Sequence, residues 1–315
     1  MPNDLEQSIF QTLCWFSVSD RPVTGFEIWK WLLEPSRSFT LAEIYHALSS
    51  SEWLKERVLT DRGFYSLVAM GDDVLDYSTQ NHIERAIATR QDRYIDAIRK
   101  FHKLKNAALF FQLFESVRAV TAVNSIAWWN TDTSSDIDLF IVVKPNAIWS
   151  TRLWMVMPFA LFGIRPHVSE VIDPFCFSFF ATSESLAMNA LRLKEGDHYF
   201  AFWTKSMVPL FDRNDQMKTF VEANTWADAL LPNAKQRRVH YLHRSRRVPA
   251  IVRHTGLFES FYKSIQQKRF PQSIQELANK DSRVVITDDM LKFHDNDRRA
   301  EFERNYQDRV NNIGV

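Results

Sequence analysis

Two apolar runs of β-strand character, residues 117–123 and 139–143, constrain the fold more than any other feature of this sequence. A short polar stretch separates them, and a helical pattern followed by a third β-type run, 175–180, comes next. Strands that alternate with helices form a sheet against which the helices pack. The sequence therefore predicts an α/β domain in which 117–123 and 137–143 lie in the same sheet.

Two carboxylates stand at the start of the second run. Asp136 and Asp138 are two residues apart, so on an extended strand both side chains point to the same side, about 6.5 Å apart. Such a pair can hold one or two Mg²⁺ (or Mn²⁺) ions against a triphosphate, and Ser125, upstream, can donate to a phosphate oxygen. We predict that Asp136 and Asp138 are the metal ligands and the catalytic residues.

The spacing of Ser125 and the two acids resembles the signature of the nucleotidyltransferase superfamily related to DNA polymerase β, in which Gly-Ser precedes Asp-x-Asp on a strand. Nearly the whole chain is similar to a group of bacterial proteins with a nucleotidyltransferase domain, through segments that include 147–153 and 288–294. The resemblance implies Mg²⁺-dependent transfer of a nucleotidyl group from an NTP to a hydroxyl of a nucleic acid, a protein or a small molecule. Asn124, Ser125 and Ser135 are the nucleotide contacts that we expect.

Two departures from the superfamily pattern concern this site. Asn124 stands where the superfamily has glycine, although Asn is the other residue that best tolerates a positive φ. The superfamily also supplies a third carboxylate from a later strand, whereas 175–180 contains none and only Glu170 and Asp173 precede it. The alternative function is a catalytically degenerate protein that binds nucleotide or nucleic acid and acts as a regulator.

The first seventy residues show three short helical patterns followed by a β-hairpin. Thr24 and Thr40 stand at N-cap positions, and Asp61-Arg62-Gly63 supplies the hairpin turn. This order is typical of a winged helix-turn-helix. The segment has six Lys or Arg against nine Asp or Glu, and its expected recognition helix, 40–54, has no Lys or Arg. Because a DNA-reading helix needs cations, we favour a packing or protein-contact role over DNA reading.

A long helix over 82–114 is expected to connect this module to the α/β domain. Its apolar stripe comprises Ile83, Ile87, Tyr94, Ile98, Phe101 and Leu104, and we interpret its many cations as a solvated face. The predicted fold class is mixed α+β. The predicted domains are a winged-helix domain (1–75), a connecting helix (76–115), a nucleotidyltransferase-like domain (116–200) and a helical C-terminal region (201–315).

Composition excludes several classes of protein. None of the seven glycines falls in a dinucleotide-binding or Walker-type loop, and the two distant cysteines provide no zinc module or disulfide framework. The start of the chain lacks the pattern of an export signal, so we expect a cytoplasmic protein. The longest uncharged apolar run, 153–164, is too short to cross a bilayer and is interpreted as a buried helix, so no membrane partner is expected.

Two later segments carry further hypotheses. No acidic residue occurs between Asp228 and Glu259, and we predict phosphate, RNA or DNA contacts within the basic segment 235–253; a solvated helix face stays open as the alternative. The contacts are assigned to Arg237, Arg238, Arg244, Arg246 and Arg247. The segment 288–299 is expected to open a helix capped by Thr287 or Asp288, and it offers Asp289 or His294 as a missing site group, with capping and surface ion pairing as the alternative.

Overall fold

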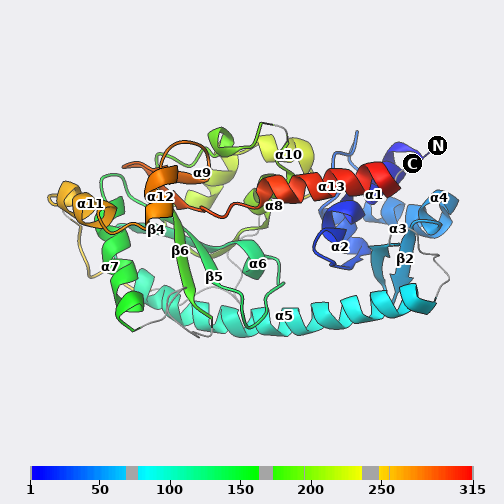
Figure 1. The fold of residues 1–315 in the computed structure, drawn as a ribbon, viewed down its shortest axis with the longest axis horizontal. Helices are drawn as coiled ribbons and strands as arrows, with labels where there is room; N and C mark the ends of the chain where they lie inside the picture. Colours follow the sequence, from blue (N-terminus) through cyan, green and yellow to red (C-terminus); the bar gives the residue numbers. More distant parts are fainter. Residues whose placement is uncertain are drawn as a thin grey trace.

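The computed structural model describes residues 2–68, 77–162, 173–194, 196–235, 248–254 and 256–313. It has a mixed α+β fold with a small three-stranded sheet and a six-stranded sheet, and the long helix α5 (Tyr77–Phe111) runs past both (Figure 1). The mixed α+β class expected from the sequence is confirmed.

The N-terminal part consists of short helices and a β-hairpin. Its elements are α1 (Asp4–Ser17), β1 (Val23–Thr24), α2 (Gly25–Lys30), α3 (Leu41–Ser50), α4 (Glu52–Lys55), β2 (Val58–Asp61) and β3 (Phe64–Leu67). Thr24 and Thr40 cap α2 and α3, as predicted, each in a reciprocal box with the Glu three residues later. The hairpin turn is also confirmed, with positive φ at Arg62 and Gly63.

The expected helix 40–54 is interrupted within this part. Ser51 adopts an extended backbone, and its side chain caps the separate helix α4. The side chain of Ser51 accepts a hydrogen bond from the Leu54 amide at 3.2 Å. Serine competes with helical hydrogen bonding in this way, so a run of three serines ends α3.

Helix α5 connects the two sheets, but its apolar stripe is only partly buried. Ile83 and Ile87 pack against the hairpin, and Phe101 and Leu104 lie in the core of the larger sheet. Between these contacts, the stripe residues Tyr94 and Ile98 are exposed. The helix therefore crosses a gap between two cores, and the expectation of one continuous buried stripe is wrong.

The six-stranded sheet has the strand order β7-β4-β5-β6-β9-β8, and only the β5–β6 pair is parallel. Its strands are β4 (Val117–Ala122), β5 (Ile137–Val143), β6 (Phe175–Thr182), β7 (Val208–Asp212), β8 (Val284–Ile286) and β9 (Met290–Phe293). The first two predicted runs are neighbours, as expected. The region 201–315, expected to be helical, contributes three strands, because its short apolar runs complete both edges of this sheet.

Helices cover both faces of the sheet. Leu139 and Ile141 face α5 and α7 (Ile148–Leu161), whereas Phe140 and Val142 face α8 (His198–Ser206) and α9 (Gln216–Ala223). The remaining helical elements are α6 (Asn124–Ala127), a 3-10 turn (Asn189–Leu191), α10 (Trp226–Leu230), α11 (Glu259–Gln267), α12 (Gln272–Leu277) and α13 (Arg299–Ile313).

The apolar run that begins at residue 153 is less buried than predicted. Trp149, earlier on α7, is buried, but Trp154, Leu161 and Phe162 are exposed. Among the described residues, no helix combines the length and the apolar character that a membrane span requires.

The last helix returns to the first. Helix α13 packs along α1, so both ends of the chain lie at the same end of the molecule (Figure 1). Trp15 of α1 stacks on Phe202 of α8 with ring centroids 4.6 Å apart, and Tyr306 of α13 contacts the same Trp15 edge-on at 6.0 Å. This aromatic cluster joins the N-terminal part to the helices that cover the larger sheet.

Candidate functional site

Strand β5 positions the predicted acidic pair. Asp136 lies just before the strand and Asp138 is its second residue, and both side chains are half-buried. Phe140, two residues further on, belongs to the core under α8 and α9. The alternation of side chains along a strand therefore directs the two carboxylates to the α8 side of the sheet.

Asn124 meets Asp138 from the neighbouring strand connection. It follows β4 with a φ of 55°, the left-handed conformation that the superfamily's glycine adopts without strain. Its side chain hydrogen-bonds the carboxylate of Asp138, and the amide of Val123 donates to the Asp138 carbonyl at 3.1 Å. The substitution of glycine is thus accommodated in the backbone, and the added amide contacts the second acid directly.

The two predicted serines lie on either side of the acids in the chain. Ser125 is a half-buried residue of α6 whose carbonyl accepts from Trp128 and Asn130. The hydroxyl of Ser135 instead belongs to a turn, since it accepts from the Asp132 amide at 3.0 Å and donates to the Asp132 carboxylate at 3.2 Å. Of these two serines, Ser125 has the less committed hydroxyl.

A cysteine lies opposite Asp138 on the parallel strand. Cys176 of β6 pairs in register with Asp138, and its thiol hydrogen-bonds the carboxylate. Asp173, a candidate for the third acid, is buried under α5, where it accepts from Arg99 at 2.6 Å and lies 3.5 Å from Lys100. It is therefore neutralised by cations of α5 rather than added to the pair. Glu170 lies outside the described residues.

The electrostatics of Asp138 follow from this crowding. Burial raises the pKa of Asp138 to about 6, and the nearby charge of Asp136 acts in the same direction. Hydrogen bonds from Asn124 and Cys176 and the charge of Lys100 lower it only in part. Because two acids share one face, a cation placed between them would relieve this repulsion.

Lys100 is a residue of this site that the sequence analysis placed on a solvated face. Its side chain is fully buried and donates to the carbonyls of Asp132 and Ser135, the latter at 2.6 Å. It thereby fixes the loop that leads into Asp136. The signal was present, since Ala97, Lys100 and Leu104 follow helical spacing on the buried side of α5.

The segment 288–299 returns to the sheet, but as a strand and not as a helix. Strand β9 pairs with β6, and the Nε2 atom of His294, just after it, lies 3.0 Å from the hydroxyl of Ser178. Ser178 in turn hydrogen-bonds the thiol of Cys176. His294 is therefore linked to Asp138 through two side chains, whereas Asp289 bonds Thr182 at the opposite end of β6.

A cavity of about 380 Å³ adjoins the acidic pair. It is lined by Asn124, by Tyr199 and other aromatic residues of α8, and by His294 and the turn that follows β9. Burial and then the charge of Asp138 raise the pKa of Tyr199, so its hydroxyl stays protonated. Asn124 is the residue shared between the cavity and the acidic pair.

Trp128 and Trp129, in the loop beside the site, pack against other elements. Trp128 lies 4.7 Å from Trp31 of the N-terminal part, and Trp129 lies 4.5 Å from Phe101 of α5, measured between ring centroids. Their rings therefore serve packing, which agrees with the expectation that at least one is a core residue.

Two predicted features are not brought into this site. Arg237, Arg238, Arg244, Arg246 and Arg247 lie outside the described residues, and so do His240 and His243. In the described part of the chain, no group of three or more His, Cys, Asp or Glu side chains is placed to hold a metal ion.

Comparison of the chain with protein-family models, with curated proteins and with solved structures finds no match. The geometry of Asp136, Asp138 and their neighbours is therefore the basis for a functional assignment.

Proposed function

We propose that this chain is a nucleotidyltransferase-like protein that binds an NTP through a magnesium ion held by Asp136 and Asp138, and that it acts as a binding protein rather than as a transferase. The observation that carries the proposal is the pairing of Asp138 with Cys176. A thiol occupies the place on the adjacent strand from which a third carboxylate would complete a two-metal site.

The acidic pair suits one magnesium ion. Mg²⁺ usually keeps several waters and is bound by one or two carboxylates together with substrate phosphates. Asp136 and Asp138 provide two carboxylates on one face, and the like-charge repulsion that raises the pKa of Asp138 favours a bound cation. When bound, the ion would neutralise phosphate charge. Asn124 and Lys100 orient Asp138 and the loop before Asp136.

A second ion lacks its ligands. Two-metal transfer requires carboxylates that hold both ions about 3.5–4 Å apart. Cys176 stays protonated, because burial and the adjacent carboxylates raise the pKa of its thiol, and Asp173 is committed to Arg99 and Lys100. Binding without transfer is therefore the function that these side chains support best.

The N-terminal part supports a regulatory role through packing or protein contact. We interpret it as a winged helix in which α3 would be the recognition helix. The exposed residues of α3 include Tyr45 and His46 but no Lys or Arg, so this face lacks the cations that gather DNA phosphates.

Calorimetry with ATP, GTP, CTP and UTP, with and without Mg²⁺, tests the binding proposal. Asp136→Asn/Asp138→Asn should abolish the Mg²⁺-dependent part of the affinity while keeping side-chain shape. The matched control Asp92→Asn/Asp308→Asn removes the same charge from exposed positions and should bind as the unaltered protein does. Equal Mg²⁺ dependence in the site variant and the unaltered protein would refute the site.

A transfer assay tests the second half of the proposal. The protein is incubated with each labelled NTP, Mg²⁺ or Mn²⁺ and cell extract, and labelled RNA, protein or small product is sought. We expect no label above that obtained with Asp136→Asn/Asp138→Asn. Label that depends on the two acids would show that the protein is an enzyme.

A further inference from the structure

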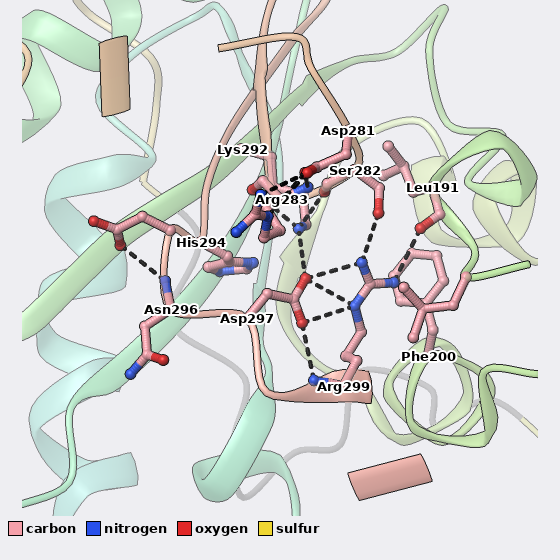
Figure 2. Close-up of polar contacts among 12 residues, drawn as sticks. Leu191, Phe200, Asp281, Ser282, Arg283, Lys292, His294, Asn296, Asp297 and Arg299 are labelled. Atoms are coloured by element: carbon pink, nitrogen blue, oxygen red, sulfur yellow. Dashed lines mark hydrogen bonds and ion pairs between the residues drawn. The ribbon is translucent and has the colours of Figure 1, made fainter. Parts of the chain in front are cut away.

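The cavity beside the acidic pair has a wall made by the turn that follows β9. Asp297 lies at the centre of this wall, between Lys292 and Arg299 (Figure 2). Lys292 also donates to the carbonyl of Ser282 at 2.6 Å, and Arg299 donates to the carbonyl of Leu191 at 3.0 Å. The turn is thereby fixed to two other segments of the chain.

The buried charges of this wall compensate one another. Lys292, Arg299, Asp297 and Asp197 are all nearly inaccessible, and Arg299 pairs with both acids, at 2.7 Å to Asp197 and 2.9 Å to Asp297. Two cations and two anions leave no net charge, and their hydrogen-bonding groups are already engaged. The wall is therefore rigid and suited to an uncharged ligand rather than to a phosphate or an ammonium group.

The floor of the cavity is aromatic. Trp203 is stacked between Phe179, at 5.4 Å and 20°, and Phe200, at 5.3 Å and 23°. Tyr199 and Phe302 line the same cavity. A volume of about 380 Å³ falls within the range of small-molecule sites, about 300–1,000 Å³. A flat ring fits a cavity with such a lining.

Two polar groups in the lining have no hydrogen-bond partner among the residues that the structure describes. One is the hydroxyl of Tyr199, which makes aromatic contacts only. The other is Nδ1 of His294, since Nε2 contacts Ser178. Burial lowers the pKa of His294 to about 3, so the ring is neutral. Because the Ser178 hydroxyl is directed to Cys176, Nε2 of His294 donates and Nδ1 is an acceptor.

We propose that this cavity binds a nucleobase that presents an amino group beside an unprotonated ring nitrogen, namely adenine or cytosine. The amino group donates to Nδ1 of His294, and the hydroxyl of Tyr199 donates to the ring nitrogen. Uracil and guanine present an N–H at the ring position, and uracil also turns a carbonyl toward the acceptor. The inference rests on the proposed function for the phosphates, which Asn124 places next to this ring site.

Nucleosides separate the ring site from the metal site, because they carry no phosphate. In calorimetry without Mg²⁺, we expect adenosine and cytidine to bind at least tenfold more tightly than uridine and guanosine. Tyr199→Phe should remove this preference, and because the hydroxyl has no partner among the described residues, the substitution costs no hydrogen bond there. The control Tyr94→Phe, on the exposed middle of α5, should leave it unchanged.

The outcomes distinguish this inference from the proposed function. Asp136→Asn/Asp138→Asn should lose Mg²⁺-dependent NTP binding but keep nucleoside preference. Mg²⁺-dependent NTP binding without any preference among nucleosides would overturn the ring site and leave the metal site intact. If Tyr199→Phe is unstable, Asn124→Gly provides a second test, since it is compatible with the local backbone and should reduce adenosine affinity; equal affinity in both variants and the unaltered protein would also refute the ring site.

Discussion

The side chain of Asn124 hydrogen-bonds the carboxylate of Asp138, while the backbone of Asn124 holds a φ of 55°. One residue thus meets a conformational demand that usually selects glycine and also stabilises the charged form of an acid that burial disfavours. The departure from glycine adds a ligand-facing amide without obstructing the turn.

Substitution of Asn124 separates these two contributions. Asn124→Gly keeps the positive φ accessible, so the free energy of unfolding should change little. Asn124→Ala should cost about 1–2 kcal/mol, because the left-handed conformation is strained for alanine. Urea unfolding of both variants measures this difference. Equal stability of the glycine and alanine variants would contradict the backbone argument.

The raised pKa of Asp138 predicts a pH-dependent stability cost. An acid whose pKa is higher in the folded state destabilises that state where it is ionised, so the cost is absent below about pH 4 and complete above about pH 6. Asp138→Asn lacks this cost. Its stability relative to the unaltered protein should therefore rise with pH, by up to about 3 kcal/mol between pH 4 and pH 7.

Thermal or urea unfolding of both proteins across this pH range, in the presence of a chelator, provides the measurement. Other titrating groups cancel in the difference between the two proteins. Asp92→Asn, on an exposed position of α5, should show a constant difference from the unaltered protein. A difference for Asp138→Asn that does not vary with pH would contradict the assigned burial.

Lys100 should contribute strongly to stability. Lys100→Met keeps the side-chain length but leaves Asp173 and Asp96 with fewer cations and frees the carbonyls of Asp132 and Ser135. Loss of one partner from a buried charge cluster costs about 3–5 kcal/mol. Lys103→Met, on the same helix and 3.8 Å from Asp173 but partly exposed, should cost about 1 kcal/mol or less.

Urea unfolding of the two methionine variants compares these costs directly. Hydrogen exchange should also become faster in residues 131–136 of Lys100→Met only, because its ammonium group holds that loop. Similar losses in both variants would place the contribution of Lys100 at the level of a surface pair.

Local sequence signals predicted much of the architecture. The caps at Thr24 and Thr40, the hairpin turn and the pairing of 117–123 with 137–143 follow from short-range rules, because each depends on neighbouring residues. The three strands contributed by 201–315 could not be predicted in the same way. β9 has only four residues, and its strand conformation comes from pairing with β6, which is distant in sequence.

The candidate site was predictable in part for the same reason. Asp136 and Asp138 share a face because they are two residues apart on one strand. The positions of Cys176, Tyr199 and His294 depend on strand register and on the return of β9, which no spacing in the sequence specifies. Lys100 was misplaced because charge was given more weight than its helical spacing from Ala97 and Leu104.

The basic segment 235–253 gives the last prediction, which depends on its charge alone. If Arg244, Arg246 and Arg247 contact a polyanion, their replacement by Ala should weaken binding and flatten its dependence on salt. Three lost phosphate contacts would reduce the slope of log affinity against log salt by about 2.7 on duplex DNA and about 2.1 on single strands. The acidic N-terminal part and the cation-free α3 make this segment the expected main source of any nucleic-acid affinity.

Fluorescence anisotropy with RNA and DNA oligomers at several salt concentrations measures both the affinity and the slope. The control Lys55→Ala/Lys218→Ala/Lys280→Ala removes the same charge from other positions and should leave the slope unchanged. Because the control has the same net charge as the arginine variant, a flatter slope in the arginine variant alone locates the contact in this segment. Equal affinity and equal slope in the arginine variant and the unaltered protein would eliminate it as a nucleic-acid site.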